Sequence, residues 1–373
     1  MKPATYAVLN LEALAHNLNT VREFADGAKV MAVIKANGYG HGLLRVAKAL
    51  SGADAFAVAR VEEAMRLREA GIRQRIVVLE GFACAEELEH LIDHDIDVVI
   101  HNFEQLQGLE NCSHPGVISV WLKIDTGMNR LGFEVSDFAG VYQRLQNCPK
   151  VLSPIQLMTH LANADKKQDQ KTAMQIALFE DAVGDCPGDK SIANSAGILA
   201  WQQARKNWVR PGIMLYGVSP FAESDGRVFG LRPVMSLRSR LLAVKQIDTG
   251  QTVGYGGQWV CKKPTLLGVI AVGYGDGYPR QVKAGTPVLV NNVRVPVIGR
   301  ISMDMMTVDL QDCSDAVAGD SVTLWGEGLP VEEIAGYADT IPYTLLCGIT
   351  QRVQIVEEDV SDQAKAKPSS VNS

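Results

Sequence analysis

The stretch Val30-Met-Ala-Val-Ile-Lys-Ala-Asn-Gly-Tyr-Gly-His-Gly42 gives the strongest indication of the fold. Its apolar first half predicts a buried strand over Val30–Lys35, and its glycines predict a turn directly afterwards. A helix is predicted before it, over Leu11–Phe24. The strand ends on Lys35, so a charged amine is expected at the carboxyl end of a strand. In a barrel of parallel strands, that edge carries the catalytic residues.

Similar apolar runs follow this strand and alternate with helical patterns such as Val61–Ala70 and Ala173–Val183. Eight strand–helix units in series predict a (β/α)8 barrel of the TIM type, within the α/β class. An open, doubly wound sheet is the alternative. The predicted strands are Val30–Lys35, Ala55–Arg60, Ile76–Gly81, Asp97–His101, Val120–Asp125, Ile155–His160, Ser191–Ser195 and Trp208–Pro211.

The pattern changes after about Phe221, where strand-like runs alternate with Gly, Pro, Asn and Asp turns. We therefore predict a barrel domain over 1–225, a mainly β domain over 226–357 and a disordered polar tail over 358–373. The predicted β-domain strands are Val234–Ile247, Thr265–Val272, Thr286–Val290, Val293–Gly299, Met306–Leu310 and Ser321–Trp325, followed by helices at Val331–Tyr337 and Tyr343–Cys347.

The composition excludes several classes of protein. The 373 residues are 47% hydrophobic and 21% charged, which is ordinary for a globular chain, and the net charge is −6. No run of Lys and Arg suggests a nucleic-acid partner. The sequence has neither a secretory signal nor an apolar stretch long enough to span a membrane. Its seven cysteines are scattered, which favours reduced thiols and a cytoplasmic location.

Taken alone, Lys35 is best interpreted as an ordinary solvated lysine at the end of a strand. A partly desolvated lysine at this position could instead form a Schiff base. A possible phosphate site changes this balance. Asn194-Ser-Ala-Gly197 and Val209-Arg-Pro-Gly-Ile213 follow the last two predicted barrel strands, where barrels often bind phosphate through backbone N–H groups. An amine on the first strand and a phosphate cradle on the last two suit a pyridoxal phosphate. Ordinary turns are the alternative reading of the two glycine segments.

The sequence resembles the alanine racemases, the barrel-type pyridoxal-phosphate enzymes, over about residues 3–356. The segments that carry the resemblance occur in family order across both predicted domains. They are Val33-Ile-Lys-Ala-Asn-Gly-Tyr-Gly-His-Gly42, Lys123-Ile-Asp-Thr-Gly-Met-Asn-Arg-Leu-Gly132, Met158-Thr-His-Leu161, Asn194-Ser195, Val209-Arg-Pro-Gly-Ile213, Val253-Gly-Tyr-Gly-Gly257, Val272-Gly-Tyr-Gly-Asp-Gly-Tyr278, Gly299-Arg-Ile-Ser-Met-Asp304 and Ile341-Pro-Tyr343.

The resemblance implies a racemase that interconverts L- and D-alanine with pyridoxal 5'-phosphate and two bases. Lys35 would form the Schiff base with the cofactor and act on one face of the substrate. Tyr255 would act on the other face from the second subunit of a homodimer with shared sites. His160 would contact Tyr255, and Arg210 would hydrogen-bond the pyridine nitrogen. The other implied cofactor ligands, which would hold the phosphate, are Tyr39, Ser195, Gly212, Ile213 and Tyr343.

The substrate side of the site is implied in the same way. Arg130 would bind the cofactor's phenolic oxygen and the substrate carboxylate, and the backbone N–H of Met303 would come from the second subunit. Lys123 would carry a carbamate that orients Arg130; an ordinary lysine with a bound anion is the alternative. Residues lining the entrance would be Tyr274, Arg300 and Asp304.

Three other readings are open. His90 and His94 have helical spacing but no third ligand, so we expect no metal site. A barrel-type amino-acid decarboxylase resembles the chain less, and the tyrosine of Val253-Gly-Tyr-Gly-Gly257 argues against it. A non-catalytic pyridoxal-phosphate-binding barrel would lack the second domain.

The chain departs from the family pattern at Gly38 and at Gly275, where alanine is common.

Overall fold

The computed structural model describes residues 4–357, which form two compact units. One unit comprises Leu14–Arg232. The other comprises residues up to Ala13 together with those from Pro233 onward. Each unit has its own core and is described separately.

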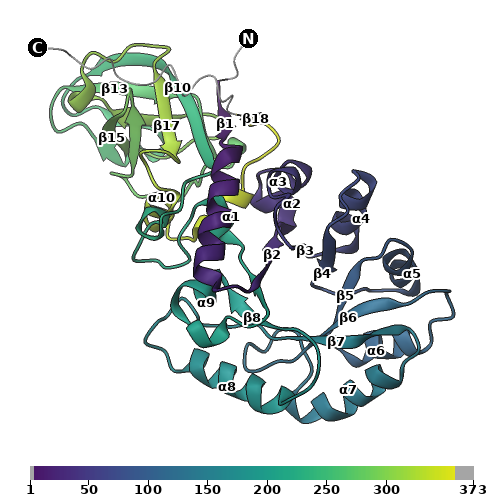
Figure 1. The fold of residues 1–373 in the computed structure, drawn as a ribbon. Coiled ribbons are helices and arrows are strands. Elements are labelled where there is room, and N and C mark those ends of the chain that lie inside the picture. Colours follow the sequence, from purple (N-terminus) through teal and green to yellow (C-terminus); the bar gives the residue numbers. More distant parts are fainter. Residues whose placement is uncertain (1–3, 358–373) are drawn as a thin grey trace, which may run out of the picture. The chain divides into compact units, whose positions relative to one another are not determined.

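The first unit is a closed barrel of eight parallel strands, drawn in purple to green in Figure 1. The last strand pairs with the first, which confirms the predicted barrel and excludes the open sheet. All four residues of Ala55–Val58 are buried because side chains fill the interior and helices cover the outside. The strands are β2 (Lys29–Val33), β3 (Ala55–Val58), β4 (Arg75–Val78), β5 (Asp97–Ile100), β6 (Ile118–Lys123), β7 (Val151–Met158), β8 (Lys190–Asn194) and β9 (Trp208–Arg210).

Helices follow the strands and lie outside them (Figure 1). Helix α5, for example, buries Leu88 and Leu91 on one face and turns its glutamates outward. The helices are α1 (Leu11–Ala25), α2 (Lys35–Tyr39), α3 (Leu43–Ala49), α4 (Val61–Glu69), α5 (Ala85–Asp93), α6 (Phe103–Glu110), α7 (Phe138–Asn147), α8 (Lys171–Val183) and α9 (Ser195–Ala200).

A charged and aromatic cluster fills the amino-terminal end of the barrel. The guanidinium carbon of Arg75 lies 5.5 Å from the ring centre of Trp121 and 5.7 Å from that of Trp208. Arg75 also binds the buried carboxylate of Asp97, with Nε 2.6 Å from Oδ2. Burial raises the pKa of Asp97, although Arg75 and the Nε1–H of Trp121 act against this rise. The cluster is therefore a buried charge pair closed off by aromatic rings.

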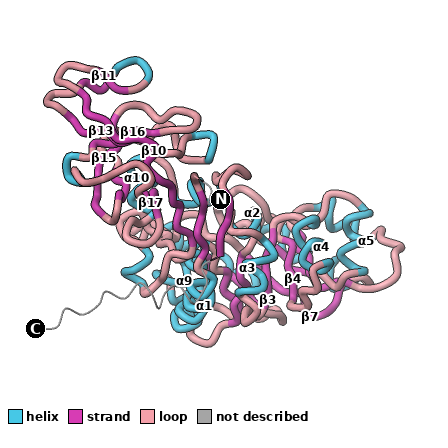
Figure 2. The backbone as a smooth tube through the Cα atoms, turned by 90° about the horizontal axis from the view of Figure 1, so that it is seen from above, coloured by secondary structure: helices cyan, strands magenta, loops and turns pink. Residues whose placement is uncertain are grey.

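The second unit is built on an eight-stranded sheet in the order β13-β16-β15-β14-β17-β10-β1-β18, with a small separate hairpin β11-β12. Figure 2 shows its strands in magenta around α10. Its strands are β1 (Tyr6–Leu9), β10 (Met235–Ile247), β11 (Thr252–Val253), β12 (Trp259–Val260), β13 (Thr265–Ile270), β14 (Pro287–Val290), β15 (Val293–Ile298), β16 (Met306–Asp309), β17 (Ser321–Trp325) and β18 (Gln354–Glu357), and its helices are α10 (Val331–Tyr337) and α11 (Pro342–Cys347).

The mainly β character of this unit was predicted, and the amino terminus reads as strand-like, but its place in this unit was not predicted. Strand β1 pairs antiparallel with β10 and parallel with β18. Its residues therefore group with the second unit, whereas the sequence prediction assigned them to the barrel domain. A four-residue strand with alternating burial fits either kind of sheet, and only the tertiary pairing decides between them. The tail predicted over 358–373 lies outside the described residues.

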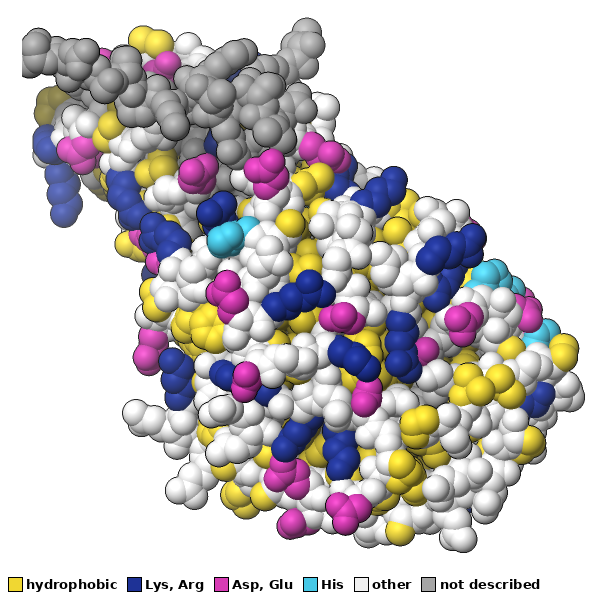
Figure 3. Space-filling model, in the orientation of Figure 1, with side chains coloured by type: hydrophobic (Ala, Val, Ile, Leu, Met, Phe, Trp, Pro, Cys, Tyr) yellow, Lys and Arg dark blue, Asp and Glu magenta, His cyan; other side chains and the backbone are white. Residues whose placement is uncertain are grey.

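Among residues 4–357, no helix is long and apolar enough to cross a bilayer. On the face drawn in Figure 3, Lys and Arg side chains are interspersed with Asp and Glu side chains. That face offers no continuous basic surface for a nucleic-acid backbone.

Candidate active site

Five side chains predicted to act in the site stand at the same edge of the barrel. Lys35 follows β2, Lys123 ends β6, His160 follows β7, Ser195 follows β8 and Arg210 ends β9. All eight strands run parallel, so these positions share the carboxyl edge of one closed sheet. The structure thus brings the predicted barrel residues together.

Lys35 does not extend the strand as predicted, because β2 ends at Val33 and a left-handed turn follows. Ala36, Asn37 and Tyr39 have φ values of 53°, 55° and 52°. This conformation costs roughly 1–2 kcal/mol for each ordinary residue, although asparagine tolerates it better. The Oδ1 of Asn37 accepts the N–H of Leu43 at 3.0 Å, which holds the turn in place.

Sequence reasoning missed two residues that support this turn. His41 is fully buried, and its Nδ1 donates to the carbonyl of Tyr39 at 2.8 Å. Burial lowers the pKa of His41 to about 4, so the ring is neutral at neutral pH. The centre of the Tyr216 ring lies 4.7 Å from the centre of the His41 ring. The rings of Tyr216 and Tyr39 are stacked, with their centres 4.6 Å apart. His41 stands in the Gly-Tyr-Gly-His-Gly motif, which could have indicated it, whereas no motif indicated Tyr216.

A backbone cradle joins the ends of β8 and β9. The Oγ of Ser195 accepts the N–H of Gly212 at 2.9 Å. A Cβ on Gly212 would lie 2.4 Å from the hydroxyl oxygen of Tyr39, so a side chain there would collide with Tyr39. Ile213 follows at the start of a short 3-10 helix and is buried. Hydroxyl groups and a close backbone approach are what a phosphate group needs.

Arg210 is buried, and its guanidinium is held at several points. Its Nη1 donates to the Oγ of Ser191 at 2.5 Å, and its Nη2 donates to the carbonyl oxygen of Thr159 at 2.6 Å. Burial lowers the pKa of Arg210 to about 10, which still leaves it charged at neutral pH. The site therefore contains a fixed, oriented cation. Neither Ser191 nor Thr159 was singled out from the sequence.

His160 stands next to Arg210, with Nδ1 3.4 Å from Nη2. Burial is the main cause that lowers the pKa of His160 well below its usual value, and Arg210 and Lys123 add to the effect. Its ring is therefore neutral at neutral pH.

Lys123 is buried within the same group of cations. The pKa of Lys123 is lowered to about 7, mainly by burial and then by repulsion from Arg210 and Arg130. The carboxylate of Asp125 acts in the opposite direction. Lys35 also lowers the pKa of Lys123. The positive charges at this edge therefore repel one another, and an anion would relieve the repulsion.

The loop that carries Arg130 is organised by Asp125. The carboxylate accepts the N–H groups of Gly127 at 2.8 Å, Met128 at 2.9 Å and Arg130 at 3.2 Å. Burial raises the pKa of Asp125, but these backbone donors outweigh it and keep the pKa below its usual value. The carboxylate is used to shape the loop, and the Arg130 side chain is left exposed.

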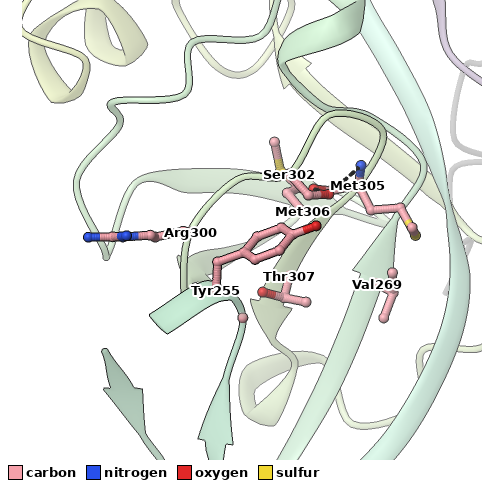
Figure 4. A pocket seen from close by; sticks show the side chains of 8 residues that line it. Tyr255, Val269, Arg300, Ser302, Met305, Met306 and Thr307 are labelled. Carbon is pink, nitrogen blue, oxygen red and sulfur yellow. Dashed lines mark hydrogen bonds between the residues drawn. The ribbon is translucent and has the colours of Figure 1, made fainter. Parts of the chain in front are cut away.

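The second unit contains a separate group of predicted site residues around a pocket of about 420 Å³. Tyr255 is 70% exposed, and its ring lies over this pocket between Ser302 and Thr307 (Figure 4). Arg300 extends away from the ring, and its Nε donates to Gln258 at 3.0 Å. The predicted second base thus stands on the surface of its own unit.

The remaining predicted residues lie on neighbouring loops of this unit. The N–H of Tyr274 donates to the carbonyl of Ser302 at 3.1 Å, so Tyr274 is next to the loop of Met303 and Asp304. Met303 is 53% exposed. Tyr343 is half-buried in α11. The predicted residues thus form two groups, one at the barrel edge and one on the loops of the second unit.

The barrel group fits pyridoxal phosphate. Because Gly212 has no side chain, the hydroxyl group of Tyr39 can lie directly against its backbone, where the hydroxyl of Ser195 also accepts the Gly212 N–H. The mutually repelling cations suit an anionic group, since an anion lowers the cost of burying them. Lys35 supplies the primary amine that Schiff-base formation requires.

The comparisons with known proteins cover both units. The family of the alanine racemase N-terminal domain matches residues 9–220, and that of the C-terminal domain matches residues 234–357. The alanine racemase of Shewanella sediminis is 52% identical over 355 residues, covering 95% of this chain and 99% of that protein. That of Shewanella amazonensis is 51% identical over 362 residues, covering 95% and 99%.

Solved structures agree with these relatives. The biosynthetic alanine racemase of Pseudomonas aeruginosa has a TM-score of 0.93 at 39% identity, covering 96% of this chain and 100% of that one. The alanine racemase of Bartonella henselae, which holds covalently bound pyridoxal phosphate, has a TM-score of 0.87 at 28% identity with the same coverage. The chain belongs to the alanine racemase family of pyridoxal-phosphate-dependent isomerases.

Proposed function

We propose that the chain interconverts L- and D-alanine, with Lys35 and the Tyr255 of a partner subunit as bases on opposite faces of the substrate. The observation that carries this proposal is the cluster at the barrel edge, where an amine, a phosphate-type cradle and three further cations converge. Tyr39, Ser195, Gly212, Ile213 and Tyr343 would hold the phosphate.

Bound pyridoxal phosphate supplies an electron sink that acidifies the Cα–H of the amino acid. Lys35 then takes or returns the Cα proton on one face. Tyr255 does the same on the other. Lysine and tyrosine have ordinary pKa values near 10, so each needs about 4 kcal/mol of help to act as a base at neutral pH. Neighbouring charges and donors must supply it.

Arg210 and Arg130 have different tasks in this proposal. The guanidinium of Arg210 would donate to the pyridine nitrogen. Because arginine has only donors and stays charged, that nitrogen would remain an unprotonated acceptor. A weaker electron sink shortens the life of the carbanion and suppresses transamination. Arg130 would bind the phenolic oxygen of the cofactor and the substrate carboxylate.

A homodimer is part of this proposal. The second unit exposes Tyr255, Tyr274, Met303 and Met305, which is more apolar surface than an isolated unit needs. Tyr255 and the backbone N–H of Met303 would reach the partner's barrel, while Tyr274, Arg300 and Asp304 would line the entrance. A cytoplasmic location stays a prediction.

We also propose that Lys123 carries a carbamate. The lowered pKa leaves a large neutral fraction of the amine at neutral pH. The neutral amine attacks carbon dioxide, forms an N–C bond and releases one proton. The product is an anion beside Arg130 and Arg210, so repulsion becomes attraction, with a planar group able to accept two bonds from Arg130.

The direct test is a chiral assay. L-alanine should yield D-alanine and no carbon dioxide, whereas a decarboxylase would release carbon dioxide. Subunit sharing is tested by mixing inactive Lys35→Ala chains with inactive Tyr255→Phe chains. A heterodimer has one intact site and one doubly defective site, so activity should return. Inactive heterodimers of verified composition would show that the two bases come from one chain.

A further inference from the structure

Two loops of the second unit are joined side by side. They are residues 273–277, which carry Tyr274, and residues 302–304, which carry Met303. The N–H of Gly275 donates to the carbonyl of Met303 at 2.9 Å, and the N–H of Tyr274 donates to that of Ser302 at 3.1 Å. The backbones of the two loops are therefore hydrogen-bonded to each other at two adjacent positions.

Arg352 links a carboxylate of each loop. Its Nη2 donates to the Oδ1 of Asp304 at 2.8 Å, and its Nε lies 3.3 Å from the Oδ1 of Asp276. The side chain of Asp276 is only 7% exposed, and its other oxygen accepts the N–H of Gly273 at 3.0 Å. Arg352 thus pairs with the buried carboxylate of Asp276 in the 273–277 loop and with the exposed carboxylate of Asp304 in the 302–304 loop.

Thr350 adds to the attachment from the same segment. Its Oγ1 donates to the carbonyl of Gly275 at 2.9 Å, and its N–H donates to that of Asp276 at 3.2 Å. Three polar groups of residues 350–352 therefore hold the 273–277 loop.

Gly275 leaves room for the guanidinium. A Cβ at this position would lie 2.3 Å from the Nη1 of Arg352 and 3.0 Å from the carbonyl oxygen of Met303. The end of an arginine side chain can move, but here it could do so only by loosening its contacts with Asp276 and Asp304. Arg352 therefore occupies the space that an alanine methyl group would take.

We propose that Arg352 is a positioning residue that sets the affinity for the amino-acid substrate, by fixing the loops of Met303 and Tyr274 relative to each other. The inference rests on the proposed function, in which the N–H of Met303 reaches the substrate site of the partner's barrel and Tyr274 lines its entrance. The pairing of Arg352 with the exposed Asp304 contributes little to folding. Its pairing with the buried Asp276 adds to stability, so substrate binding and unfolding are measured separately.

The test compares Arg352→Gln with Arg352→Lys and with a matched control, Arg294→Gln. Arg294 belongs to the same unit and forms an exposed pair with Glu333, at 2.7 and 2.9 Å, away from both loops. We expect Arg352→Gln to raise KM for alanine about fivefold or more while kcat changes less than about twofold, since mispositioned ligands weaken binding. Arg352→Lys should recover part of the loss. The control should leave KM and kcat unchanged. Arg352→Gln leaves the buried Asp276 without its cation, so its unfolding temperature should fall, and KM and kcat are measured well below that temperature on the folded enzyme.

A double-mutant cycle with Gly275→Ala isolates the contact. The single change should raise KM by displacing the guanidinium. In the Arg352→Gln background, the same change should add much less, because contacting residues are not additive. If the two effects multiply, or if Arg352→Gln matches the control, the inference is wrong even though the wild-type enzyme racemises alanine. If the wild-type enzyme makes no D-alanine, the proposed function itself has failed, and the inference fails with it.

Discussion

His160 accepts a hydrogen bond from Arg210, with Nη2 3.4 Å from Nδ1. Arginine has no acceptor, so Nδ1 carries no proton and the proton of the neutral ring lies on Nε2. Burial is the main reason that the pKa of the His160 ring lies well below its usual value, and repulsion from four neighbouring cations lowers it further. His160 therefore offers one N–H donor on the side opposite Arg210.

This tautomer predicts the effect of replacing His160. If its Nε2–H donates to the Tyr255 phenolate, His160→Gln keeps a donor, and His160→Leu removes it. We expect kcat/KM to fall about 100-fold or more in the leucine variant when Tyr255 is the base, with the acidic limb of the pH profile moved upward, and much less in the glutamine variant. Because the folded-state pKa is depressed, His160 should add no limb near pH 6.5. Loss of such a limb in His160→Gln would contradict the assignment.

Tyr255→Phe should separate the two faces of the substrate. The variant keeps the ring but has no proton to transfer, so racemisation should collapse while cofactor binding survives. Exchange of the Cα hydrogen for deuterium, followed by NMR, should persist for the alanine enantiomer served by Lys35 and stop for the other. Equal loss for both enantiomers would mean that Tyr255 does not serve one face.

Gly212→Ala should weaken cofactor binding without unfolding the barrel. Its Cβ would press on the hydroxyl of Tyr39, and overpacking of this kind costs about 1–3 kcal/mol. A titration followed by absorbance should show a corresponding rise in the dissociation constant of pyridoxal phosphate. Gly140→Ala is the control, because nothing lies within 4 Å of a Cβ there. Equal affinities for the two variants would disprove the steric account.

The carbamate on Lys123 should depend on pH. The pKa of Lys123 falls from 10.5 to about 7 on folding, so the amine is neutral above that pH and protonated below it. With ¹³C-labelled carbon dioxide, a carbamate signal should appear at pH 8, weaken below about pH 7 and be absent from Lys123→Ala. Without the carbamate, the unfolded chain binds the proton more tightly, so stability should decrease as pH falls from about 10.5 to about 7 and change no further below that from this group. An unmodified amine at pH 8 would exclude the proposal.

Arg75→Ala should destabilise the barrel strongly. It would leave the buried carboxylate of Asp97 without its cation, which costs about 3–5 kcal/mol. Arg144→Ala is the matched comparison, since Arg144 pairs with Glu110 at the surface at 2.6 Å. Such exposed pairs contribute about 0–1 kcal/mol. Urea denaturation measures the free energy of unfolding of both variants. Similar losses would show that the Arg75–Asp97 pair contributes no more to stability than a surface pair.

Local sequence patterns predicted most of the fold. All eight predicted barrel strands occur, because apolar runs flanked by turns are fixed by short-range chemistry. The end of β2 was predicted two residues late, since Ile34 and Lys35 continue the apolar run into a left-handed turn. Nothing local distinguishes that turn from a strand end except Gly38, and its support from His41 and Tyr216 is tertiary.

The candidate site was predicted from motifs, and the residues without one were missed. Ser195 and Gly212 stand in recognisable turns, and the structure shows them joined by a hydrogen bond. Arg352 has no motif, and its contacts with Asp276 and Asp304 depend on three segments distant in sequence. Such residues become visible only when the chain is folded.

The pairing of β1 has a consequence for how the protein is made. Tyr6 lies opposite Gln354 in a parallel pair, and β1 separates β10 from β18 in the sheet. A ribosome releases β1 before the barrel strands and β18 after them, so the barrel can close before this strand finds both of its neighbours. The first strand can therefore pair with β10 only after the barrel strands have been made, and with β18 later still, so the second sheet is completed after the barrel.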